Sequence, residues 1–376
     1  ASEQLRAFGT GAIRALSGVQ IRMLASDQVA GFGVDHLRAF SGEQMANFSS
    51  GALAGLDGAM MGAMSGAQIA AMSSVQITRL EGYQISLISS AAIREMKPTA
   101  MGVLRSDQIA ALVTNQLISL GSMQMGALSS AAIQGFDAEK IAVFGSRQVV
   151  GFGTGQLRVL SSDQVGALRS DAFVALSDKQ LGALGAEAVK GLAAVQLGAM
   201  RSNQVVGLTT SQISGLGSDQ VGALSNAALR GLSTVQLRAL GSDQVAGFVS
   251  DQLRALSSLQ VAGLSTRAVA GLGSDQVGAL GSAQTLGLVS AQLREMGSDQ
   301  IAALGESAVR GLSAGALGGL GSLQVAALVS EQLGAFSSVQ LGALTTSAVV
   351  GFEPEDVAAL GSRQVVGFGT GQLRVL

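Results

Sequence analysis

The 376-residue chain has no cysteine and no tryptophan, and it has only one histidine, one tyrosine and two prolines. Without cysteine it can form no disulfide, no thiolate metal site and no cysteine nucleophile. The single histidine, His36, has no second histidine with which to build a His-rich metal site, and no catalytic triad is recognisable around it. We therefore expect no catalytic, metal-binding or cofactor-binding residues, and we expect the protein not to be an enzyme.

Charge is also scarce, because Asp, Glu, Lys and Arg make up 13% of the chain and the formal net charge is −2. Globular proteins carry about 25% charged residues. A nucleic-acid-binding surface needs a basic face, so we expect no nucleic-acid partner. The mean hydropathy is high, +0.43, but strictly apolar runs, such as 58–64, are short. A membrane helix needs roughly 18 consecutive apolar residues, so we expect no membrane insertion.

What the chain does contain is an eight-residue repeat, and 47 octads counted from Ala1 fill it without remainder. Position 8 is Leu, Phe, Met or Ile in all 47 octads, and position 5 is apolar in every octad except the one containing Thr285. Position 4 is Gln in 31 of the 47 octads. The segment Gly217–Leu224, GSDQVGAL, represents the consensus. The array predicts a single continuous repeat domain over residues 1–376.

The period of eight fits neither a long helix nor a strand. In a continuous helix each octad would move the apolar pair about 80° around the axis, so that no fixed apolar seam would exist. In a strand, positions 5 and 8 would point to opposite faces. A short helix in each octad does fit, with its N-cap at position 1 and a capping box completed by Gln at position 4. Both prolines, Pro98 and Pro354, then fall at the first helical residue, where proline is best tolerated.

The charges support this reading independently. Sixteen of the 25 acidic residues occupy position 3, and 13 of the 23 basic residues occupy position 6. Acids in the first turn of a helix and bases near its end suit the helix dipole. We predict an all-α solenoid built from helices of under two turns, which need neighbouring helices for stability.

A second period, of 40 residues, appears where Ala replaces Gln at position 4. The replacement recurs in two series with a two-octad phase slip near residues 173–188, at Ala12, Ala52, Ala92, Ala132 and Ala172, and then at Ala188, Ala228, Ala268, Ala308 and Ala348. We predict that about five octads, or 40 residues, make one coil of the solenoid. The alternative is that a five-octad block was duplicated and that the period has no geometric meaning.

The residues that depart from the consensus have structural interpretations. His36 stands at position 4 of its octad in place of Gln, and Met60, Met61 and Met64 occupy core positions. The acids at position 3 do not follow the nonapeptide calcium repeat. The glycine-rich segment 151–155 lacks the lysine of a phosphate-binding loop. We interpret these residues as a helix-start residue, core residues, dipole-favourable acids and an octad junction, respectively.

The octads resemble the octapeptide-repeat regions of very large bacterial surface or secreted repetitive proteins, which are often described as adhesins or haem-utilisation proteins. Stretches of the family type L-T-T-x-Q-[VI]-x-A-L include 256–264 and 344–347. The resemblance covers the whole chain and implies an extracellular or cell-surface location. No recognisable set of haem ligands accompanies it. The helix starts are also similar to those of TAL-effector DNA-binding repeats, but the longer period and the base-reading dipeptide of that family are absent.

Two functions follow as hypotheses. The first is a structural protein that associates with itself, laterally or end to end, into an extracellular filament, sheath or adhesin shaft. Low surface charge favours such association. The segment 145–160 recurs identically as 361–376, so the chain ends on interior-type octads and we expect a slice of a longer array or a unit that joins end to end. The second is a monomeric solenoid that binds a peptide, a polymer or a cell-surface ligand on one face.

Overall fold

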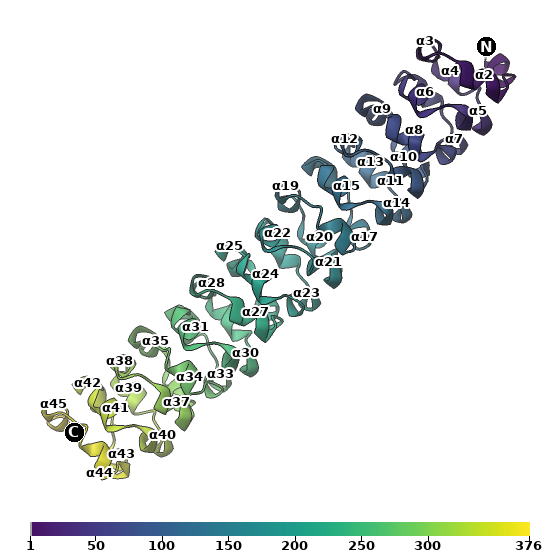
Figure 1. The fold of residues 1–376 in the computed structure, drawn as a ribbon. Helices are drawn as coiled ribbons and strands as arrows, with labels where there is room; N and C mark the ends of the chain where they lie inside the picture. The colour runs from purple at the N-terminus through teal and green to yellow at the C-terminus, as the bar shows by residue number, and fades with distance from the viewer. Residues whose placement is uncertain (1) are drawn as a thin grey trace. The chain divides into compact units, whose positions relative to one another are not determined.

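A computed structural model of the chain describes residues 2–376, with side chains described from Gln4 onward. Over these residues it contains 45 short α-helices, two 3-10 helices and no strand. Each octad contributes one helix, as predicted, and the protein is an all-α repeat solenoid (Figure 1). The chain divides into two compact units, unit 1 at residues 1–191 and unit 2 at residues 192–376, and each is described by itself.

The helices of unit 1 are α1 (Ser2–Arg6), α2 (Thr10–Ala15), α3 (Gly18–Arg22), α4 (Ser26–Val29), α5 (Val34–Ala39), α6 (Gly42–Ala46), η1 (Ala52–Gly55), α7 (Gly58–Ala63), α8 (Gly66–Ala71), α9 (Ser74–Arg79), α10 (Gly82–Leu87), α11 (Ser90–Arg94), α12 (Pro98–Met101), α13 (Ser106–Ala111), α14 (Thr114–Ser119), α15 (Ser122–Ala127), α16 (Ser130–Ile133), α17 (Ala138–Ile141), α18 (Ser146–Val149), α19 (Thr154–Arg158), α20 (Ser162–Ala167), α21 (Ser170–Phe173), α22 (Asp178–Gly182) and η2 (Ala188–Gly191).

The helices of unit 2 are α23 (Ala194–Gly198), α24 (Ser202–Val206), α25 (Thr210–Gly215), α26 (Ser218–Gly222), α27 (Asn226–Gly231), α28 (Thr234–Arg238), α29 (Ser242–Ala246), α30 (Ser250–Ala255), α31 (Ser258–Gly263), α32 (Thr266–Ala270), α33 (Ser274–Gly278), α34 (Ser282–Thr285), α35 (Ser290–Glu295), α36 (Ser298–Ala302), α37 (Glu306–Gly311), α38 (Ala314–Leu317), α39 (Ser322–Val325), α40 (Ser330–Ala335), α41 (Ser338–Gly342), α42 (Thr346–Val349), α43 (Pro354–Ala359), α44 (Ser362–Val365) and α45 (Thr370–Leu373).

The helix starts have the predicted chemistry. In α31, the backbone N–H of Gln260 donates to the hydroxyl of Ser257 at 3.2 Å, and the N–H of Ser257 donates to Oε1 of Gln260 at 3.0 Å. This reciprocal pair is a capping box. Pro98 and Pro354 are each the first residue of their helix, in α12 and α43. Each helix is therefore defined locally by its own octad.

The glutamine side chain also joins successive coils. Its Oε1 atom caps its own helix, while its Nε2 atom donates to two carbonyl groups of the preceding coil. Gln260 donates to the carbonyl of Leu229, 31 residues earlier, at 2.8 Å, and to that of Leu232, 28 residues earlier, at 3.0 Å. The same pair of bonds recurs along both units, for example at Gln76 and Gln292. Glutamine at position 4 thus acts both as a cap and as a strut between coils.

The predicted coil of about five octads is wrong. Helices that pack on one another are three octads apart, as in α24 on α27 and α34 on α37. The glutamine bonds span 28 and 31 residues, which is less than four octads. A coil therefore contains between three and four octads, the spacing at which glutamine Nε2 reaches the carbonyl groups of the preceding coil.

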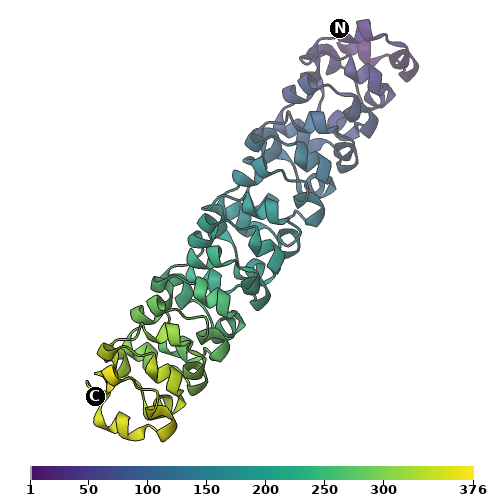
Figure 2. The same cartoon turned by 60° about the vertical axis from the view of Figure 1, so that its left-hand side comes forward.

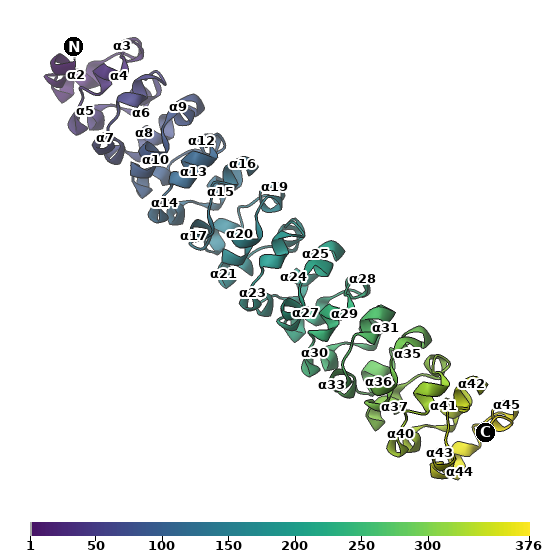
Figure 3. The same ribbon diagram turned by 180° about the vertical axis from the view of Figure 1, so that it is seen from behind.

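The 40-residue period nevertheless has a geometric meaning. In unit 2, α25, α30, α35, α40 and α45 follow one another at intervals of five octads, and they alternate between the two long sides of the unit (Figures 1 and 3). In unit 1, α3, α7, α12, α17 and α22 alternate in the same way. Five octads make about one and a half coils, so each step of 40 residues carries the chain to the opposite side.

Short helices follow one another along each unit (Figure 2). The interior of each unit is filled by positions 5 and 8 of the octads, as predicted. In unit 1, Phe144 is fully buried and makes edge-to-face contacts with Phe136 and Phe152, at centroid distances of 5.1 and 6.1 Å. Thr285, the single polar residue at position 5, is also fully buried. Its hydroxyl donates to the carbonyl of Ala308 at 2.6 Å, which satisfies it inside the core.

Candidate interaction surface

The residues that depart from the octad consensus have structural positions in the fold. His36 reproduces both roles of glutamine: its Nδ1 accepts from the N–H of Gly33 at 3.0 Å, and its Nε2 lies 2.8 Å from the carbonyl of Phe8, 28 residues earlier. Because Nδ1 is the acceptor, Nε2 carries the proton and donates. Met60 and Met61 are fully buried. These residues belong to the scaffold.

The glycine-rich segment 151–155 is an octad junction at which two coils approach closely. A Cβ atom on Gly151 would lie 2.1 Å from the carbonyl oxygen of Ser122 in the preceding coil. Gly153 is the N-cap of α19, and its N–H donates to Oε1 of Gln156. The junction is occupied by the protein's own backbone rather than by a loop open to a phosphate.

The acids of position 3 lie on the surface. Two acids have lowered pKa values: Asp107 at position 3, and Asp137, which is the N-cap of α17 at position 1. Asp107 accepts from Arg105 at 2.8 Å, and this hydrogen bond lowers the pKa of the Asp107 carboxyl and raises the pKa of the Arg105 guanidinium. The pKa of Asp137 is lowered, first by the N–H of Lys140 at 2.8 Å and then by the Lys140 ammonium. Over the described residues, no three His, Asp or Glu side chains gather as they would around a metal ion.

The feature that distinguishes the surface is a set of large apolar side chains pointing outward. Many stand at position 3, where other octads have Asp. Their exposed fractions in unit 2 include 64% for Val235, 73% for Leu259 and 79% for Leu323. In unit 1, Val19 is 64% exposed and Met123 is 78% exposed. Because these side chains are exposed, they add little buried apolar area to the packing of their own helices. We therefore treat them as the candidate interaction surface.

Sequence reasoning missed these residues. Position 3 was interpreted as a site for helix-start acids, and the octads that lack an acid there were not distinguished from the others. The signal was present as the alternation of Asp with Val, Leu or Met at one position of the repeat. Its meaning depends on the number of octads per coil, which decides which position-3 residues share a side.

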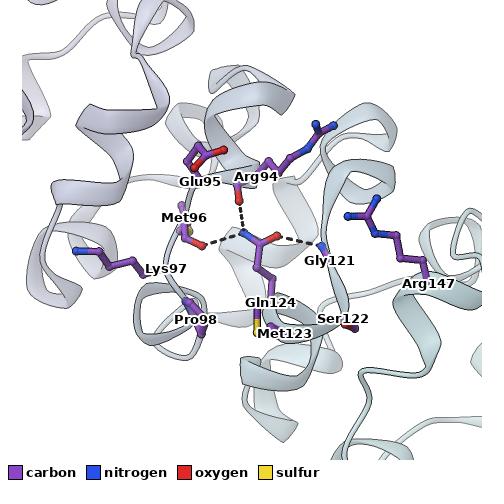
Figure 4. A pocket seen from close by; sticks show the side chains of 10 residues that line it. All are labelled: Arg94, Glu95, Met96, Lys97, Pro98, Gly121, Ser122, Met123, Gln124 and Arg147. Carbon is purple, nitrogen blue, oxygen red and sulfur yellow. Dashed lines mark hydrogen bonds between the residues drawn. The ribbon is translucent and has the colours of Figure 1, made fainter.

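One pocket of about 380 Å³ lies in unit 1 between α11, α12, α15 and α18. Arg94, Lys97 and Arg147 line it together with a single acid, Glu95 (Figure 4). Its floor includes Gln124, whose amide donates to the carbonyl of Met96 at 2.9 Å. The side chains of the three cations are exposed at the pocket.

Comparison with known families agrees with this architecture. Six segments match the model of the ALTTAQ repeat, at residues 1–34, 141–178, 189–226, 213–250, 226–258 and 246–282. The chain is a repeat protein. No curated protein matches it at a significant level. Within residues 2–376 of this repeat protein, every helix is too short to cross a bilayer.

Proposed function

We propose that this repeat protein is a structural element that associates with other copies of itself into a filament, sheath or adhesin shaft at the cell surface or outside the cell. The observation that supports the proposal is the series of outward-facing apolar side chains, represented by Val235 and Leu259. Exposed apolar groups repeated along a regular scaffold favour association. The small net charge of −2 opposes it only weakly.

The scaffold suits a mechanical role. Each coil is joined to the next by buried glutamine bonds, such as those from Gln292 to the carbonyls of Val261 and Leu264 at 2.9 and 2.8 Å. Because these bonds recur from coil to coil, a load on one coil is shared with the next. The resemblance to the repeat regions of bacterial surface proteins supports the location.

The test is the size of the purified chain as a function of concentration. We expect light scattering after size exclusion to show assembly at micromolar concentration, and electron microscopy to show elongated particles. The double substitution Val235→Ser with Leu259→Ser should raise the concentration needed for assembly by roughly tenfold. Ala291→Ser changes the same octad position in α35 and serves as the control. A chain that stays monomeric throughout the concentration series would contradict the proposal.

A monomeric binding module is the second candidate, and the pocket lined by Arg94, Lys97 and Arg147 favours it. Three cations around one acid suit an anionic polymer. Titration calorimetry with polyglutamate would test this function, using Arg94→Ser with Arg147→Ser as the variant and Arg230→Ser with Arg267→Ser in unit 2 as the matched control. Saturable binding to a monomer, lost only in the pocket variant, would favour the module over the filament.

A further inference from the structure

Charge is separated between the two long sides of unit 2. One side, which we call the acidic edge, contains α23, α30, α33, α40 and α43 (Figures 1 and 3). These helices and their caps have one base, Arg254, and the acids Asp251, Asp275, Glu331, Glu353, Glu355 and Asp356. The base forms an exposed ion pair with Asp251 at 3.3 Å, so the other carboxylates determine the charge of this edge.

The opposite side, which we call the cationic edge, contains α25, α28, α31, α35, α38, α42 and α45. These helices and their caps have one acid, Glu295, and the bases Arg238, Arg294 and Arg374. Large exposed apolar side chains occur on both edges, but position 3 differs in the following helices. Position 3 is Val235 in α28 and Leu259 in α31, whereas position 3 on the acidic edge is Asp251 in α30 and Asp275 in α33.

Unit 1 shows the same separation by itself. Its cationic edge, formed by α3, α6, α9, α12, α19 and α22, has two acids, Glu43 and Asp178, and the bases Arg22, Arg79, Lys97, Arg158 and Lys179. Its acidic edge, formed by α5, α7, α14, α17 and α21, has the bases Arg38, Lys140 and Arg169 and the acids Asp35, Asp57, Asp137, Glu139 and Asp171. Val19 and Val75 occupy position 3 on the cationic edge.

The helices have the same spacing along both edges, because one chain alternates between the two edges. Each step of five octads takes the chain from one edge to the other, so helices recur along both edges with equal spacing. The valines at the N-caps of α30, α35 and α40, namely Val249, Val289 and Val329, follow this step and are 54%, 44% and 46% exposed. Two surfaces of opposite charge and equal spacing fit one another along their length.

We propose that a second copy of this chain packs sideways against the first, with the acidic edge of one copy against the cationic edge of the other. This inference rests on the proposed self-association and specifies its surface. Two acidic edges would repel one another, so the contact joins unlike edges. After one contact each copy keeps one free edge, and the pair still presents one free edge of each kind. A contact of this heterologous type leads to open arrays rather than closed dimers.

The edges can be tested on the full chain by charge reversal. Asp275→Lys with Glu331→Lys removes most of the net negative charge of the acidic edge of unit 2, and Arg238→Glu with Arg294→Glu makes both edges of unit 2 acidic. Asp243→Lys with Asp299→Lys is the matched control, because it changes the same octad position and the same total charge on α29 and α36, outside both edges. Circular dichroism confirms that each variant is folded.

We expect each edge variant alone to need at least tenfold more protein to assemble. An equimolar mixture of the two should assemble at a lower concentration than either variant alone, because the unchanged cationic edge of one variant then meets the unchanged acidic edge of the other. The control should assemble like the wild type. Edge variants that assemble alone as readily as the control would overturn this proposal, while self-association itself would stand. A monomeric wild type would instead overturn the proposed function, which separates the two failures.

The salt dependence of assembly is a second test of the edge-to-edge contact, and it needs no substitution. At about 1 M salt the Debye length is near 3 Å, and contacts between exposed charges are screened. We expect wild-type assembly to weaken between low salt and 1 M NaCl. Assembly that strengthens steadily over this range would show an apolar contact without charge pairing and would overturn the edge-to-edge arrangement.

Discussion

The side-chain amide of Gln332 donates to the carbonyl oxygen of Leu304, 28 residues earlier, at 2.6 Å. The same amide group caps its own helix, since the N–H of Val329 donates to Oε1 of Gln332 at 2.9 Å. One buried side chain therefore fixes both the start of α40 and the position of the preceding coil. Repeated along the array, this link explains why helices of four to six residues, which are marginal alone, persist in the fold.

Gln332→Ala should destabilise this region by about 1–3 kcal/mol, because it leaves the N–H of Val329 and the carbonyl of Leu304 without their partner. Gln332→Glu should cost at least as much, since a carboxylate placed there can only accept and would face the carbonyl oxygens. Chemical denaturation gives the magnitude. Hydrogen exchange should show faster opening near Leu304 and little change in unit 1.

The neighbouring Glu331→Gln is the control, because Glu331 is exposed and takes no part in the strut. It should change stability by less than about 0.5 kcal/mol. If Gln332→Ala were as mild as this control, neither the cap nor the strut would contribute measurably, and the coils would be held by apolar packing alone.

Local structure could be predicted from the sequence in detail. The cap at position 1, the proline sites and the buried pair at positions 5 and 8 all depend on contacts within one octad or with the octad before it. The number of octads per coil could not be predicted. It depends on the second function of glutamine, the bond from Nε2 to a carbonyl 28 residues away, and the capping box had already accounted for the residue.

The candidate interaction surface could not be predicted either, because it also depends on the number of octads per coil. Val235 and Asp275 both occupy position 3, and the sequence shows them five octads apart with nothing to say that they face opposite sides. The coil places one on α28 and the other on α33, on different edges of unit 2. The number of octads per coil must be known before the apolar residues at position 3 can be assigned to one side of the unit.

Gly351→Ala should destabilise unit 2 by more than about 1 kcal/mol. A Cβ atom there would lie 2.0 Å from the carbonyl oxygen of Ser322, so the two coils would have to separate. Gly334→Ala is the matched control, because Gly334 lies within α40 and a Cβ there meets nothing within 4 Å. Alanine in a helix is favoured over glycine, and this variant should gain about 0.5–1 kcal/mol. Opposite signs in denaturant melts are expected; equal effects would mean that the coils do not touch at Ser322.

Phe144→Ala should cost about 3–5 kcal/mol, because it removes a fully buried ring and its contacts with Phe136 and Phe152. Phe144→Leu keeps the position 8 consensus and much of the volume, and it should cost roughly half as much. Thermal unfolding followed by circular dichroism measures both variants. A loss of the same size for Leu and Ala would place the energy in the aromatic contacts rather than in the filled interior.

Asp137 should make the stability of unit 1 depend on pH. Its pKa in the folded chain is lowered below its ordinary value of 3.8, first by the hydrogen bond from the N–H of Lys140. A lowered pKa stabilises the fold above the ordinary value, and this contribution is lost as the pH falls through the folded pKa. The melting-temperature gap between the wild type and Asp137→Asn should therefore be constant near neutral pH and close as the solution is acidified below 3.8.

Lys140→Ala separates the two causes of this pKa shift. It keeps the backbone N–H, which is the larger cause, and removes only the ammonium group that pairs with Asp137 at 3.0 Å. The Asp137 carboxyl followed by NMR should therefore still titrate below its ordinary value in Lys140→Ala. A carboxyl that returns to 3.8 in this variant would assign the shift to the surface ion pair and remove the helix cap as the source of the pH dependence.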